Sequence, residues 1–167
     1  MGPISLKTDV DAPREQVLDF ISDLSARPSW TDHFTHEYRL ERIPPQGTGA
    51  AARFRVNAPA GMRYLETVIA EVERPHRVVE HGRGGRLDRI PVRTVWELKE
   101  GPVTQVQLTF WTAPTHPIDR VREFGRSRWW RRRWSKALRR LREAVEGGPE
   151  SVPRAQVAGA DPQPSSV

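Results

Sequence analysis

The stretch Ile4–Pro13, with the sequence ISLKTDVDAP, predicts how the fold begins. From Ile4 to Val10 inward and outward residue types alternate, which is the period of a strand with one buried face. Asp11 and Pro13 then favour the start of a helix, because an aspartate can cap free backbone amides and proline is tolerated in the first turn. The apolar residues that follow at helical spacing form one stripe, namely Val17, Phe20, Ile21 and Leu24.

Between His36 and Thr112 the sequence returns to the period of strands. Turn sequences divide this region at Pro44–Gly49, Ala58–Gly61 and Gly82–Gly85. The alternation predicts a single antiparallel sheet with one face turned inward. The residues expected on that inward face are Tyr38, Leu40, Ala52, Phe54, Val56, Met62, Tyr64, Glu66, Val68, Ala70, Val72, Ile90, Val92, Thr94, Trp96, Leu98, Val106, Leu108 and Phe110.

The final element is expected to be a long helix that begins near Pro117. Its apolar residues form two stripes on different sides of the helix axis. One stripe consists of Ile118, Val121 and Gly125, and the other of Trp130, Trp134, Ala137, Leu138, Leu141 and Val145. Because a straight helix cannot bury both stripes against one surface, we expect a break between Gly125 and Trp129.

Composition predicts one domain over residues 1–147, followed by a disordered tail over residues 148–167 that is rich in proline, glycine, serine and alanine. The chain of 167 residues has no cysteine, which favours a reducing cytoplasm. It also lacks a signal-like start and a continuous apolar run of membrane-spanning length, so we expect neither a signal peptide nor a transmembrane helix. Between His116 and Gly147 eleven Arg or Lys residues face four Asp or Glu, a balance of +7 in a chain whose net charge is +6.

The order of elements and several local signatures resemble the START-like polyketide cyclase/dehydrase family of the SRPBCC superfamily. The resemblance covers residues 5–146. The residues that carry it are Val10-Asp11-Ala12-Pro13, Val17, Phe20, Asp23, Pro28-x-Trp30, Gly47-Thr48-Gly49 before Phe54, Thr67 to Glu73, Trp96-Glu97-Leu98 and Ala137 to Leu141. It implies an α+β helix-grip fold, in which a curved antiparallel sheet wraps around a long C-terminal helix and two short helices follow the first strand.

The same resemblance implies an internal cavity that binds a hydrophobic, aromatic or polyketide-like molecule. Family members include cyclases, aromatases and dehydratases as well as non-enzymic carriers of lipids, quinones or pathway intermediates, so both functions stay open. Among the single-domain aromatase/cyclases the resemblance leads one to look for a tyrosine shortly after Pro-x-Trp, which Tyr38 matches, and for an arginine that reaches into the cavity. Arg53, Arg55 and Arg63 do not supply it, since alternation turns them outward.

The candidate site residues are those that the pattern places around the cavity. The candidate ligand-binding residues are Trp30, His33, Phe34, Phe54, Tyr64, Trp96 and Phe110. Tyr38 and Glu66 are the candidate catalytic residues, because either side chain could exchange protons with a substrate. Glu66 should also have a raised pKa, since it is a carboxylate on an apolar face. Two alternatives remain open: the aromatic side chains simply fill the core, or Glu66 turns outward at a bulge or pairs with an arginine.

Other chemistry is disfavoured. His33 and His36 lack a third metal ligand, and the glycine-rich turns lack the strand-turn-helix context of a phosphate loop, so we expect no metal and no cofactor. The basic residues of the final helix are expected opposite its apolar stripe, at Arg128, Arg132, Lys136, Arg139 and Arg140. They form either an ordinary solvated face or a docking surface for an acidic carrier protein or an anionic surface; nucleic acid ranks lower, since no base-reading motif is present.

Overall fold

The computed structural model describes residues 1–59 and 64–156. Seven antiparallel strands form one sheet in the order β1-β7-β6-β5-β4-β3-β2. The strands are β1 (Ile4–Val10), β2 (Thr35–Leu40), β3 (Ala51–Val56), β4 (Tyr64–Glu73), β5 (Arg77–Gly84), β6 (Ile90–Lys99) and β7 (Thr104–Thr112). The helices are α1 (Arg14–Ser22), α2 (Pro28–Thr31), α3 (Pro117–Phe124) and α4 (Ser127–Glu146), with short 3₁₀ turns η1 (Arg86–Asp88) and η2 (Pro149–Ser151).

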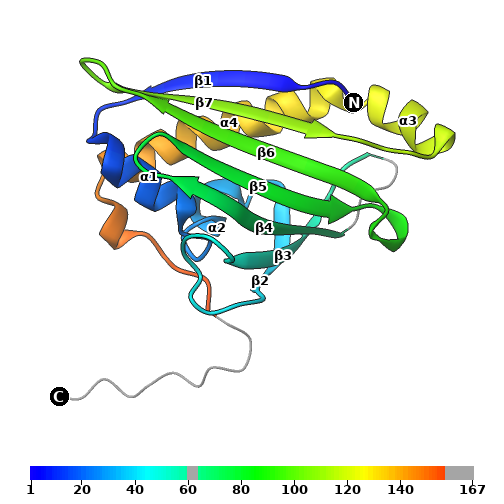
Figure 1. Cartoon of the computed structure of the whole chain (residues 1–167), viewed down its shortest axis with the longest axis horizontal. Helices are drawn as coiled ribbons and strands as arrows, with labels where there is room; N and C mark the ends of the chain where they lie inside the picture. Colours follow the sequence, from blue (N-terminus) through cyan, green and yellow to red (C-terminus); the bar gives the residue numbers. More distant parts are fainter. Residues whose placement is uncertain (60–63, 157–167) are drawn as a thin grey trace.

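Figure 1 shows that α4 runs along one face of the sheet, with α1 and α2 on the same side. The curved sheet and this long helix confirm the predicted helix-grip architecture. The alternation predicted for β6 and β7 is also confirmed, because the inward residues from Ile90 to Leu98 and from Val106 to Phe110 are buried. None of the helices in the described ranges combines the length and the apolar character needed to cross a lipid bilayer.

The start of α1 differs from the prediction in one respect. All four residues of its predicted apolar stripe are buried, but its N-terminus has no side-chain cap from Asp11. Instead, the backbone N–H of Asp11 donates to a carboxylate oxygen of Glu146 at 2.9 Å. This bond joins the end of β1 to the last turn of α4.

In β4 the predicted inward face is wrong. Leu65, Thr67 and Ile69 are buried, whereas Tyr64 is 41% exposed and Glu66 is exposed. The register with β3 explains the difference, because Leu65 lies opposite Phe54 and directly paired residues share one face of a sheet. A register shift between Ile69 and Glu71 then returns the end of the strand to the predicted phase, and Val72 packs against the core. Met62, which belonged to the same prediction, lies outside the described residues.

The break in the final helix is confirmed, since α3 ends at Phe124 and α4 begins at Ser127. The second predicted stripe is buried along α4 from Trp130 to Val145. The first stripe is not: Ile118 and Val121 are exposed, and the buried residues of α3 are instead Asp119 and Glu123.

The first residues of the C-terminal tail pack against the domain, contrary to the prediction. The backbone N–H of Ala155 donates to the carbonyl oxygen of Ser25 at 2.7 Å, and Arg154 forms an ion pair with Asp23. Val152 also packs against the core. The prediction of an unpacked segment from Gly148 is therefore wrong up to residue 156, and residues 157–167 lie outside the described part.

Candidate functional site

Six aromatic side chains meet between the sheet and α4. Trp30 and Phe34 come from α2 and the loop after it, Trp96 from β6 and Phe110 from β7. The helix α4 contributes Trp130 and Trp134, which share one face because they are four residues apart. We call Trp30, Phe34, Trp96, Phe110, Trp130 and Trp134 the aromatic cluster; all six are at most 6% exposed.

Ring contacts connect the whole aromatic cluster. The centroid distances are 5.7 Å from Trp30 to Trp96, 5.9 Å from Trp96 to Trp134, 5.3 Å from Phe34 to Trp134 and 4.6 Å from Phe110 to Trp130. Most pairs are edge-to-face, an arrangement that aromatic rings favour. The rings therefore occupy the space in which the sequence predicted an open cavity.

Beside the aromatic cluster lies a buried ion pair. The guanidinium of Arg27 donates to Glu80 through Nη2 to Oε1 at 2.7 Å and through Nη1 to Oε2 at 3.2 Å. The same carboxylate accepts from Trp96 Nε1 at 2.7 Å and from Thr67 Oγ1 at 3.0 Å. The guanidinium also lies 4.8 Å from the ring centroid of Trp30. Four donated hydrogen bonds offset much of the cost of burying this charge.

The sequence analysis did not find this pair. Glu80 could have been suspected, because Val78 and Glu80 are two residues apart on β5 and share its inward face. Arg27 gave no such signal, since it lies in the irregular segment before α2. It is nevertheless a buried arginine that reaches the core.

Several buried donors in this region have no acceptor among the described residues. They are the indole Nε1 atoms of Trp30, Trp130 and Trp134 and the Nε atom of Arg27. All four carry N–H groups, and a buried donor without an acceptor costs about 1–3 kcal/mol. The aromatic cluster thus offers flat apolar surface together with hydrogen-bond donors, which is the complement of a ring-bearing molecule with acceptor oxygens.

His33 lies at the rim of the aromatic cluster, between α2 and α4. Its Nε2–H donates to the carbonyl oxygen of Arg133 at 3.0 Å, and its ring contacts Phe34 edge-to-face. Burial lowers the pKa of this imidazole, so the ring is neutral at neutral pH. Next to it Arg140 binds the carboxylate of Asp32, with Nη2 and Oδ2 3.1 Å apart. Arg140 was predicted on the solvated face of the helix but instead ties α4 to α2.

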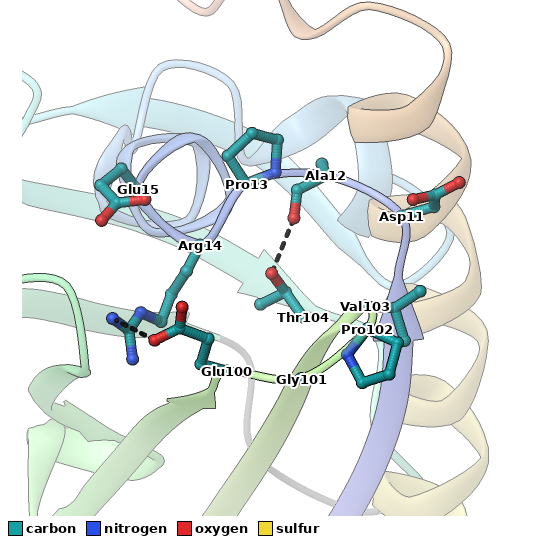
Figure 2. A pocket seen from close by; sticks show the side chains of 10 residues that line it. All are labelled: Asp11, Ala12, Pro13, Arg14, Glu15, Glu100, Gly101, Pro102, Val103 and Thr104. Carbon is teal, nitrogen blue, oxygen red and sulfur yellow. Dashed lines mark hydrogen bonds and ion pairs between the residues drawn. The ribbon is translucent and has the colours of Figure 1, made fainter.

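Four hollows of the described structure open to the surface, and none of them is lined by the aromatic cluster. Figure 2 shows one of about 430 Å³ between the start of α1 and the turn from β6 to β7. Arg14 pairs with Glu100 across it at 3.2 Å, and Thr104 Oγ1 donates to the carbonyl oxygen of Ala12 at 2.7 Å. Arg14 and Glu100 are thus paired within the hollow, and none of the predicted site residues lines it.

A family model described as polyketide cyclase / dehydrase and lipid transport matches residues 1–146. The chain belongs to this family. Among solved structures it is similar to the KanY protein, with a TM-score of 0.67 and 19% identity over 88% of this chain and all of that one. No curated protein matches the chain.

Two further structures share the fold. One is DynU16, described as a putative protein in the dynemicin biosynthetic locus, with a TM-score of 0.60 and 21% identity over 88% of this chain and 48% of that chain. The other is the major latex-like protein 151 of Panax ginseng, with a TM-score of 0.58 and 11% identity over 87% and 95% of the two chains. At these identities the likenesses establish the fold.

The tyrosine suggested by the family resemblance, Tyr38, lies against the core. Its ring stacks on Phe54 at a centroid distance of 5.5 Å, and its hydroxyl donates to the carbonyl oxygen of Leu24 at 2.9 Å. Burial raises the pKa of this phenol, and the Glu80 carboxylate acts in the same direction while Arg27 opposes it. At neutral pH the hydroxyl therefore keeps its proton and can only donate it.

Tyr64 and Glu66 do not join the other predicted site residues. Both lie on the outer face of the sheet, where the hydroxyl of Tyr64 donates to Glu37 at 3.0 Å. Glu66 borders an outer hollow with His81 and Arg83. The prediction that Glu66 is a buried acid or base facing the inside is wrong, and the open alternative of an outward Glu66 is the one observed. The structure thus assembles Trp30, Phe34, Trp96 and Phe110, with His33, Tyr38 and Phe54 around them.

Proposed function

We propose that this member of the polyketide cyclase / dehydrase and lipid transport family binds a flat, apolar molecule with several acceptor oxygens at the aromatic cluster. The observation that carries the proposal is the set of four buried N–H donors without acceptors, at Trp30, Trp130, Trp134 and Arg27. A purely structural core would gain nothing from them, because each unpaired donor lowers stability. A bound ketone, quinone or polyphenol supplies the missing acceptors, whereas a saturated acyl chain does not.

Binding requires the rings of the aromatic cluster to separate and line a cavity around the ligand. Contacts between rings are then replaced by contacts between rings and ligand, which have similar geometry and energy. The Arg27–Glu80 pair stays in place beside the site, since its groups are already bound to each other and to Thr67 and Trp96. The ligand identity that fits these features is aromatic or polyketide-like.

A cyclase, aromatase or dehydratase activity is the second candidate, and Tyr38 is the observation that favours it. Its protonated hydroxyl lies close enough to Arg27 and Glu80 to feel both charges. With a poly-β-keto substrate, this hydroxyl would exchange its hydrogen bond to Leu24 for one to a substrate carbonyl oxygen, and that bond would assist aldol condensation or loss of water. The alternative function, a non-enzymic carrier of a lipid, quinone or intermediate, needs the aromatic cluster alone.

The unpaired indole donors yield a direct test of binding. In the variant Trp130→Phe/Trp134→Phe we expect the affinity for 1,8-dihydroxyanthraquinone to fall about tenfold or more, because two hydrogen bonds of about 0.5–1.5 kcal/mol each are removed while the rings remain. Affinity is measured by quenching of intrinsic tryptophan fluorescence. Anthracene, which has no acceptors, should bind parent and variant equally.

The matched control is Trp111→Phe, because Trp111 lies on the outer face under Arg93, at 5.4 Å from the guanidinium carbon to the ring centroid. This variant should bind the anthraquinone like the parent. Equal affinity of the parent for anthracene and anthraquinone would contradict the role of the donors. A parent that binds neither compound would overturn the proposed site.

The catalytic candidate is tested by Tyr38→Phe. We expect anthraquinone affinity to change less than threefold, while formation of aromatic product from a synthetic poly-β-keto N-acetylcysteamine thioester falls at least a hundredfold. Product is followed by absorbance and mass. If the parent forms no more product than buffer does, the activity is absent and the carrier function remains.

A further inference from the structure

The helix α3 is amphipathic, but its polar side faces the protein. Its buried residues are Asp119 and Glu123, with Glu123 fully buried. Its large apolar residues point to solvent: Ile118 is 54% exposed, Val121 76% and Phe124 83%. Amphipathic helices normally bury the apolar stripe, so this orientation leaves a contiguous apolar ridge without a partner in the described chain.

Specific contacts hold α3 in this orientation. Arg89 Nε donates to Asp119 Oδ2 at 2.8 Å, and Thr112 Oγ1 donates to Glu123 Oε2 at 2.7 Å. Arg126 forms an ion pair with Glu123 at the break between the two helices. Three hydrogen-bonded contacts, from Arg89 just before β6, from Thr112 at the end of β7 and from Arg126 at the helix junction, therefore fix the polar side inward. The outward apolar ridge follows from them and is not a frayed helix end.

Another exposed apolar side chain lies at the same end of the molecule. Leu87, in η1, is 84% exposed, and Figure 1 shows the loop with η1 and the helix α3 at the same end of the sheet. The ion pair between Arg89 and Asp119 connects the two segments. We call Leu87, Ile118, Val121 and Phe124 the end patch.

Exposed arginines flank the end patch on α3 and at the start of α4, and one exposed acid, Asp88, lies beside Leu87. Arg120 and Arg122 are exposed on α3, and Arg128, Arg131 and Arg132 are exposed on the first turns of α4. An acidic group of α3 does not offset them at the surface, because Asp119 and Glu123 are buried in ion pairs. Protruding apolar side chains flanked by exposed arginines are the composition of a helix that lies in the interface of an anionic membrane.

We propose that the end patch docks on an anionic lipid bilayer, with Leu87, Val121 and Phe124 inserted among the acyl chains and the arginines against lipid phosphates. Charge complementarity selects this occupant, since the five exposed arginines of α3 and the first turns of α4 lie beside the end patch. The shape agrees, because protruding apolar side chains can enter a fluid lipid interface without a matching surface, whereas a protein partner needs a matching groove. This docking does not depend on what the aromatic cluster binds.

Insertion can be observed directly, because the chain has no cysteine and a single introduced cysteine is labelled uniquely. Phe124→Cys is labelled with a nitrobenzoxadiazole dye and mixed with vesicles of 30% phosphatidylglycerol and 70% phosphatidylcholine. We expect a blue shift and a severalfold rise in emission. The matched control is Ile43→Cys, since Ile43 is equally prominent at 75% exposed but lies in the loop after β2; its emission should not change.

Cosedimentation with the same vesicles measures affinity. We expect Val121→Ser/Phe124→Ser to bind at least tenfold more weakly than the parent, and Ile43→Ser to bind like the parent. Arg120→Glu/Arg122→Glu should weaken binding by a similar factor, as should 0.5 M salt for the parent, because exposed charges are screened. All five positions are exposed, so urea unfolding should show unchanged stability.

Several results would overturn the proposal. One is a parent that fails to bind the anionic vesicles at low salt, and another is equal binding by the end-patch and Ile43 variants. A third is a parent that forms a dimer in sedimentation equilibrium which Val121→Ser/Phe124→Ser dissociates, without vesicle binding. That result would make the end patch an interface between two copies of the chain.

Discussion

Replacing Glu80 by glutamine is expected to lower the free energy of unfolding by about 3–5 kcal/mol. The substitution keeps the shape of the side chain but removes the charge that faces Arg27 at 2.7 Å, and Arg27 is only 4% exposed. The guanidinium of Arg27 would then be buried without a counter-charge, and an uncompensated buried charge strongly destabilises the folded state. Urea denaturation followed by far-ultraviolet circular dichroism measures the change.

A surface pair provides the matched control. Arg55 and Glu37 are nearly as close, at 3.0 Å, but each side chain is nearly half exposed. Glu37→Gln should therefore cost much less than Glu80→Gln, because exposed ion pairs contribute little to stability. The double variant Arg27→Met/Glu80→Leu removes both charges and should recover most of the loss, since apolar replacements of buried pairs are often neutral. If Glu80→Gln is no worse than Glu37→Gln, water reaches Arg27 and the core at this point is open.

The sequence predicts the faces of some strands better than those of others. In β6 bulky residues such as Val92 and Trp96 alternate with Arg93 and Glu97, so one face is clearly the inner one. In β4 both faces carry apolar residues, because Leu65 and Ile69 compete with Val68 and Val72. Only the register with β3 decides between the two phases, and register is a property of pairing and not of one strand.

The buried ion pairs also could not be predicted from the sequence. Arg27 and Glu80 are 53 residues apart, so their pairing depends on how the segment before α2 meets β5 in the folded chain. The same holds for α3, where Asp119 and Glu123 pair inward with groups on other elements. Because Asp119 and Glu123 are buried in their ion pairs, α3 turns its polar side to the protein, opposite to the orientation that its apolar stripe predicted.

Part of the aromatic cluster could be predicted, because its residues belong to elements whose inner face is clear from the sequence. Trp96 and Phe110 belong to strands with a clear inner face, and Trp130 and Trp134 belong to a clear helical stripe. What patterning could not show is that the helix tryptophans fill the space that a cavity would occupy. It also could not show that their indole donors have no acceptor among the described residues. Both findings depend on side-chain orientation.

Replacing Trp96 by alanine is expected to lower the free energy of unfolding by about 3–5 kcal/mol, towards the upper end of this range. Trp96 is fully buried, its ring contacts Trp30 and Trp134, and its Nε1 donates to Glu80. The substitution removes the packing of a large ring and one of the four hydrogen bonds that the buried carboxylate accepts. Trp96→Phe keeps most of the ring, and the intermediate loss expected for it, about 1.5–3 kcal/mol, isolates the hydrogen bond to the charged group.

The cavity left by Trp96→Ala should bind indole, which has the size and the N–H donor of the missing side chain. Because a ligand that binds only the folded state raises stability in proportion to the logarithm of its concentration, millimolar indole should raise the unfolding midpoint of this variant and leave the parent unchanged. Trp111→Ala on the outer face is the control, since it opens no enclosed space and should show no rescue. A Trp96→Ala variant of nearly parental stability would show that the ring is a mobile wall and not packing. Loss of anthraquinone binding in that stable variant would then place the ligand against Trp96 itself.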